Sequence, residues 1–71
     1  MMIPLHELLK IMREEKKLSY EQLALKSHVS IDKLQHYELG TQIPSIQTIL
    51  KLSSVLEYPA SNLVESLKVK S

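Results

Sequence analysis

The placement of one glycine and three prolines is the sequence feature that most constrains the fold of this chain of 71 residues. Each of them lies between stretches in which apolar residues recur with the period of a helix. The first stretch has the i, i+3, i+4, i+7 pattern of an amphipathic helix, formed by Leu5, Leu8, Leu9 and Met12. No stretch shows the strict alternation of apolar and polar residues that marks a half-buried strand. The sequence therefore predicts an all-α fold of short helices.

Five helices are expected, joined by short connections into a compact orthogonal bundle. Serines at the expected starts are good N-caps, and Ser19 with Gln22 three residues later forms a capping-box pattern. Gly40 is expected to end the third helix in a left-handed conformation. The expected helices run from Pro4 to about Lys17, Ser19 to about Ser27, Ser30 through Glu38, Ser45 to about Glu57, and about Ala60 to Leu67.

The length predicts a single domain over residues 1–71, with its core in 5–67 and a frayed tail at 68–71. Stability must come from packed Leu and Ile, because the chain has no cysteine, and hydrophobic residues make up 44% of it. The three histidines are scattered without zinc-ligand spacing, so we expect no metal and no cofactor. No phosphate-cradling glycine loop or nucleophile elbow is present, and a small bundle leaves little room for a pocket. We therefore expect no enzymatic activity and no small-molecule substrate.

The net charge of the chain does not by itself indicate binding to nucleic acid, since it is only +1. No apolar run exceeds three residues, so no membrane span is expected. With no export signal and no cysteine, the chain is expected to be cytoplasmic. A role in DNA binding must therefore rest on architecture and on the placement of particular residues.

The connection between the second and third helices is the most informative one, because it is only about three residues long (28–30). That length sets two helices at a steep angle in a helix-turn-helix unit. Five strings at matching mutual spacing resemble the phage-repressor and Cro-like (XRE-type) helix-turn-helix family across residues 5 to 64. These strings are Leu18–Ala24, Val29–Ser30, Tyr37–Gly40, Pro44–Ser45 and Ile49–Leu52.

The resemblance implies that the third helix reads DNA. Residues along a helix rotate by about 100°, so Leu34 and Tyr37 share one side of it. The opposite side, which the family presents to base edges, carries the base-reading candidates Ile31, Asp32, Gln35 and His36. The candidates for contacts with the DNA backbone are Tyr20, Ser30, Lys33, Thr41 and Gln42, since a lysine beside a reading face usually positions the protein and does not specify bases. Two further positions, Arg13 and Glu38, match a structural ion pair that ties the first helix to the third.

Several residues depart from the family pattern. Tyr20 stands where the family commonly has a glutamine, and His28 where glycine is usual. The segment 39–43 has lost the usual Lys, Arg and Asn residues, and Asp32 is acidic, so DNA affinity should be modest. Asp32 can accept a hydrogen bond from cytosine or simply stabilise the first helical turn. His36 can donate to guanine or phosphate, or be a solvated surface residue.

Taken together, the sequence predicts a sequence-specific transcriptional regulator, such as a repressor, that binds double-stranded DNA as a homodimer. By resemblance, the fourth and fifth helices form the dimer surface. The alternative is a protein-interaction module of the same fold with weak or no DNA binding, either antitoxin-like or a partner of a regulator. A partner surface is indicated by apolar residues at positions expected to be solvated, namely Leu25, Leu39, Ile43, Val55 and Tyr58.

Overall fold

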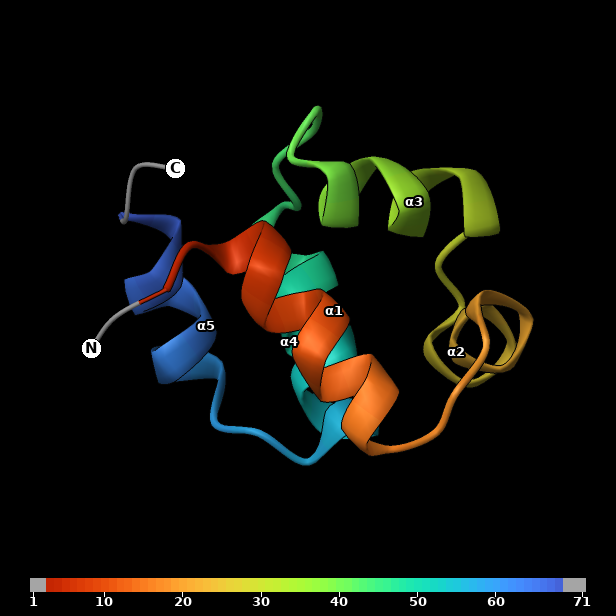
Figure 1. Ribbon diagram of the computed structural model, residues 1–71. Helices are drawn as coiled ribbons and strands as arrows, with labels where there is room; N and C mark the ends of the chain where they lie inside the picture. Colours follow the sequence, from red (N-terminus) through yellow and green to blue (C-terminus); the bar gives the residue numbers. More distant parts are fainter. Residues whose placement is uncertain (1–2, 69–71) are drawn as a thin grey trace.

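The computed structural model describes residues 3–68, and in that range the chain forms five helices and no strand. The predicted all-α helix-turn-helix fold is confirmed, and each helix lies where it was expected. The helices are α1 (Leu5–Glu15), α2 (Tyr20–Ser27), α3 (Ile31–Leu39), α4 (Ile46–Leu56) and α5 (Ala60–Leu67) (Figure 1). Beyond Lys68, the tail that was expected to fray lies outside the described residues.

Three of the helices begin at serine caps. The Ser19 hydroxyl accepts the amide of Gln22 at 3.1 Å, and the Gln22 side chain accepts the amide of Ser19 at 2.8 Å. This reciprocal pair completes the predicted capping box. Ser30 and Ser45 accept the amides of the third residues of α3 and α4, both at 3.2 Å. Local chemistry thus fixes the starts of α2, α3 and α4.

Two left-handed residues turn the chain at the ends of α2 and α3. Gly40 ends α3 with φ 80°, and a Cβ there would lie 3.3 Å from the His6 ring, so glycine suits both the backbone and the space. His28 ends α2 with φ 60° at a position where the family usually has glycine. A residue with a side chain adopts this conformation at a cost of about 1 kcal/mol. In return, the chain reverses into α3 within three residues.

One aliphatic core joins all five helices. In Figure 1, α1 crosses in front of α4, while α3 lies above them, α2 to the right and α5 to the left. Helix α3 packs against α1 and α2, and α4 packs against α2 and α5. Val29, in the turn between α2 and α3, is buried with the helical leucines. The core comprises Leu5, Leu8, Leu9, Met12, Leu23, Val29, Leu34, Tyr37, Ile49, Leu52, Leu56 and Leu63.

Two of the five apolar residues expected to be solvated are not. Val55 and Tyr58 are partly buried and pack against the core, because the end of α4 and the following turn fold back toward α5. The expectation was therefore wrong for these two residues. It holds for Leu25, Leu39 and Ile43, which are exposed.

A charged cluster fastens α3 to α1. The Arg13 guanidinium donates to Glu38 through Nε at 2.7 Å and through Nη2 at 3.1 Å, and its Nη1 donates to the Leu18 carbonyl at 2.8 Å. The Tyr20 hydroxyl donates to the same carboxylate at 3.0 Å, and its ring stacks 4.2 Å below the guanidinium. Only 12% of the Arg13 side chain and 4% of the Glu38 side chain are exposed. The pair expected from the family spacing is thus present and largely desolvated.

The cluster shifts the protonation of two of its members. The hydrogen bonds to Glu38 raise the pKa of Arg13 above its usual value, which keeps the guanidinium charged. Burial raises the pKa of the Tyr20 phenol, and its hydrogen bond to Glu38 raises it further. Both shifts favour the protonated forms that donate to the carboxylate.

Removing either charge of the Arg13–Glu38 pair should lower the stability of the fold. In Arg13→Met the carboxylate of Glu38 stays buried without its partner, and we expect the free energy of unfolding to fall by about 3 kcal/mol. The double variant Arg13→Met/Glu38→Leu should recover much of that loss, because no unpaired charge is left. Urea denaturation followed by circular dichroism measures both changes.

The matched control is Lys16→Ala, which removes the exposed ion pair between Lys16 and Glu57, 3.2 Å apart. Exposed pairs contribute about 0–1 kcal/mol, so this change should be small. Equal losses for Arg13→Met and Lys16→Ala would contradict the central role of the buried pair.

The raised pKa of Tyr20 predicts a loss of stability in alkali. The folded chain holds the phenolic proton more tightly than the unfolded chain, so this contribution is complete below the ordinary tyrosine pKa near 10 and is lost as pH rises through the raised value. Wild type should therefore lose more stability between neutral and strongly alkaline pH than Tyr20→Phe does. Thermal melts across this range measure the difference, and parallel curves for the two proteins would contradict the prediction.

Candidate nucleic-acid interface

Helix α3 turns one side to the core and the other to solvent. Leu34 and Tyr37 are buried, as predicted, and Glu38 beside them is held by Arg13. On the outward side, Ile31, Asp32 and Gln35 are exposed and His36 is half-buried. The structure therefore brings all four base-reading candidates onto one face of α3, at its first two turns.

His36 is held in place by its neighbours. Its Nδ1 lies 2.7 Å from the Thr41 hydroxyl, and its Nε2 lies 3.7 Å from the Asp32 carboxylate one turn earlier. The Thr41 hydroxyl also donates to the His36 carbonyl at 3.2 Å. A hydroxyl has one proton, so while that bond is made it is the ring that donates to Thr41. The imidazole is thus oriented by a residue outside α3.

The Asp32 carboxylate is placed to interact both with the N-terminal end of α3 and with the His36 ring. It lies in the first turn of α3, where an acidic side chain is favoured by the helix dipole, and it also faces the His36 ring. Its side chain is 83% exposed, so its oxygens remain accessible to a further donor. Both interpretations from the sequence are therefore compatible with its placement.

The residues expected to contact the DNA backbone differ in their exposure and in their hydrogen-bond partners. Ser30 and Lys33 are exposed at the start of α3, and the Ser30 hydroxyl caps the helix as an acceptor, which leaves its proton free to donate. Thr41 is exposed but committed to His36, and Gln42 is exposed in the connection to α4.

Tyr20 is the exception among these residues, because its hydroxyl already has a partner within the chain. The hydroxyl proton goes to the Glu38 carboxylate, since the first turn of α2 lies beside the Arg13–Glu38 pair. Sequence reasoning missed this role and also the bond between Thr41 and His36. The spacing of Thr41, just after a left-handed glycine that turns the chain back on α3, was the available signal for the second.

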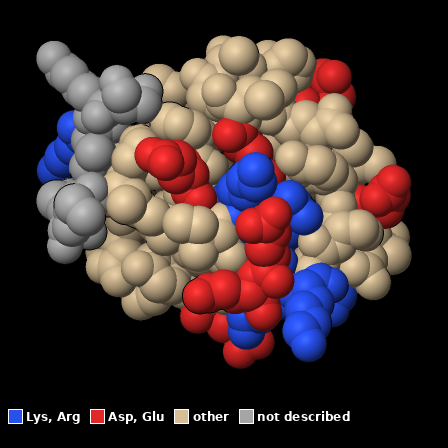
Figure 2. Space-filling model, in the orientation of Figure 1, with Lys and Arg blue, Asp and Glu red and all other residues tan. Residues whose placement is uncertain are grey.

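Charge is unevenly spread over the surface. Figure 2 shows acidic and basic side chains gathered over α1, whereas the connection between α3 and α4 at the top of the view is uncharged. From 39 to 50 the sequence contains no Asp, Glu, Lys, Arg or His. Lys33 is the single lysine or arginine of α3. The interface therefore offers few cations to phosphate groups.

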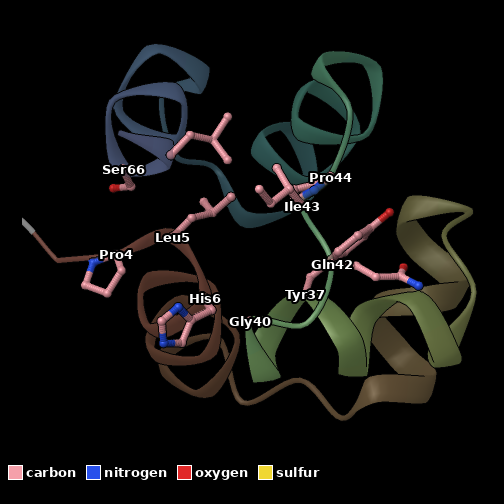
Figure 3. Close-up of a pocket in the computed structure, with 10 residues that line it drawn as sticks. Pro4, Leu5, His6, Tyr37, Gly40, Gln42, Ile43, Pro44 and Ser66 are labelled. Carbon is pink, nitrogen blue, oxygen red and sulfur yellow. The ribbon is translucent and has the colours of Figure 1, made fainter. Parts of the chain in front are cut away.

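A hollow of about 300 Å³ lies between the start of α1, the connection after α3 and the end of α5 (Figure 3). Its walls combine apolar side chains with the hydrogen-bonding groups of His6, Tyr37, Gln42 and Ser66, and no lysine, arginine, aspartate or glutamate lines it. Gln42 thus belongs to this hollow as well as to the exposed connection. The hollow adjoins the C-terminal end of α3, away from the base-reading candidates of its first two turns.

Between residues 3 and 68, no group of three or more His, Cys, Asp or Glu side chains is placed to hold a metal ion. Within the same range, no helix has the length and apolar character needed to cross a bilayer.

Comparison with known proteins agrees with this architecture. A family model described as helix-turn-helix matches residues 9–63, which include α2, the turn, α3 and the cluster around Arg13. No curated protein matches the chain. Domains of the matched family bind DNA in regulatory proteins and are not typically enzymes. Because the match covers most of its length, the chain belongs to the XRE-type helix-turn-helix family.

Proposed function

We propose that this protein is a sequence-specific transcriptional regulator that binds double-stranded DNA in the cytoplasm as a homodimer, with α3 in the major groove. The observation that carries the proposal is the outward face of α3. Four side chains of different chemistry stand on one side of a helix whose other side is locked to the core and to Arg13. A rigid helix with a free side-chain face is the form in which base edges are read.

The chemistry of the individual side chains suits some of them to read base edges and others to contact phosphate. Gln35 has both a donor and an acceptor, the pair that matches adenine in the major groove. Asp32 can accept from cytosine, and Ile31 offers an apolar contact to a thymine methyl group. Lys33 and Ser30, at the N-terminal end of the helix, are placed for phosphate, which the helix dipole also favours there.

The second candidate is a protein-interaction module of the same fold, either antitoxin-like or a partner of another regulator. It is favoured by the near-neutral net charge and by the segment 39–43, which lacks the Lys, Arg and Asn residues that are usual in the family. The two candidates differ in one measurable respect. A regulator selects particular sequences from a pool of random duplexes, whereas an interaction module enriches none at moderate salt.

Selection from random duplexes, followed by titration of the enriched site, tests the proposal and separates positioning residues from reading residues. Lys33→Ala should weaken binding to all sequences alike and reduce the slope of log affinity against log salt by about one. Gln35→Ala should instead cost about 1–3 kcal/mol at one base pair and leave the salt slope unchanged. A Lys33→Ala protein with altered sequence preference, beside a Gln35→Ala protein without one, would mean that another face reads the DNA.

Thr41 should act through His36. Thr41→Val keeps the shape of the side chain but loses the hydroxyl that orients the ring, so we expect it to weaken the same base-pair preference that His36→Ala weakens. The double variant should lose no more than His36→Ala alone, since the two residues act in one interaction.

Thr41→Ser retains the hydroxyl and is the matched control, with wild-type preference expected. Measured on a set of single base-pair variants of the selected site, a uniform loss across all of them would instead make Thr41 a phosphate contact of its own.

A further inference from the structure

The His36 ring has an oxygen opposite each of its two nitrogens. Its Nδ1 lies 2.7 Å from the Thr41 hydroxyl, and its Nε2 lies 3.7 Å from the Asp32 carboxylate. The Thr41 hydroxyl donates its only proton to the His36 carbonyl, so toward the ring it is an acceptor. A neutral imidazole has one N–H for these two acceptors, whereas an imidazolium has two. The hydrogen-bonding geometry around the ring therefore matches the protonated form.

The exposed charges of α3 cancel while His36 is neutral. Asp32 and Lys33 contribute −1 and +1, and Glu38 is buried against Arg13. The chain that follows adds nothing, because residues 39–50 contain no Asp, Glu, Lys, Arg or His. A proton on His36 thus changes the exposed charge of α3 from zero to +1. His36 also lies in the last turn of the helix, where the helix dipole favours a cation.

We propose that His36 is a proton switch for DNA binding: the ring takes up a proton when α3 meets DNA, and binding tightens as the solution becomes mildly acidic. The inference rests on the proposed function, because it is the polyanion beside α3 that makes the added charge favourable. Imidazole is the side-chain group that ordinarily changes charge between about pH 5 and 8. Phosphate oxygens and the acceptors of guanine, placed beside the ring, stabilise its cation. Uptake of one proton per chain lets the affinity rise by up to about tenfold per pH unit.

The charges around the ring leave it able to respond to DNA. Among residues 3–68, Asp32 is the one that forms an ion pair with His36, and its 83% exposed side chain leaves that pair screened by water. Lys33, three residues earlier on the same helix, is an exposed like charge. The connection from 40 to 45 has no titratable side chain. The titratable groups that α1 and α2 bring to α3 are engaged at other residues; they are Arg13 and Tyr20, which bind Glu38, and His6, which lies beside Gly40.

The experiment measures the affinity of the whole chain for its selected duplex at about pH 8 and about pH 5.5, over a series of salt concentrations. Wild type should bind about tenfold or more tightly at the lower pH, and its slope of log affinity against log salt should be steeper there by about one per chain bound. His36→Gln keeps a hydrogen-bond donor but has no proton to gain, so it should lose most of both differences. His6→Gln removes a ring outside the reading face of α3 and is the matched control, with wild-type behaviour expected. Calorimetry in buffers of different ionisation enthalpy counts the protons taken up.

The partner of the cation is found by altering the base pair whose preference changes in His36→Ala. Proton uptake that persists on the altered duplex supports phosphate as the partner, and uptake that disappears supports a base edge. Equal pH and salt dependence in wild type and His36→Gln would overturn the inference and leave the proposed function standing. A wild type that selects no duplex at either pH would overturn both. Circular dichroism verifies that every variant is folded at both pH values.

Discussion

The buried pair of Arg13 and Glu38 is the constraint on which the rest of the structure depends. Helix α3 contributes only Leu34 and Tyr37 to the hydrophobic core. The planar guanidinium accepts one orientation of the carboxylate, through two parallel hydrogen bonds, and a third bond ties it to the Leu18 carbonyl. Since burying two charges is expensive, the gain is chiefly directional. It fixes which side of α3 faces outward.

This mode of attachment explains why Tyr20 differs from what its position indicated. A carboxylate has room for more donors than one arginine supplies, and an unsatisfied buried oxygen is costly. The Tyr20 hydroxyl meets that need, while its ring covers the guanidinium and shields the pair from water. Tyr20, which the family resemblance indicated as a contact to the DNA backbone, thus joins Arg13 in holding the Glu38 carboxylate. The Tyr20 hydroxyl proton is therefore committed within the chain, and the carboxylate of α3 is held by one hydrogen bond more.

The sequence predicted the structural features that depend on residues close together in the chain. It missed the contacts between residues that lie far apart in the chain. Serine caps and the left-handed Gly40 act within one turn, so the bounds of the helices could be derived from residue type and spacing. The grouping of Ile31, Asp32, Gln35 and His36 on the outward side of α3 followed from the helical period once α3 was placed. The Tyr20–Glu38 bond joins residues 18 apart in the chain, and only the packing of α2 against α3 brings them together. The partial burial of Val55 likewise depends on how the end of α4 meets its neighbours.

The same ion pair constrains the whole of α3. Helix α3 is nine residues long, about 13 Å, and Leu39 directly follows Glu38, which Arg13 holds. Any rotation of α3 about its axis would therefore move Gln35 and Leu39 together, and it would separate Glu38 from the two nitrogens of Arg13 that donate to it.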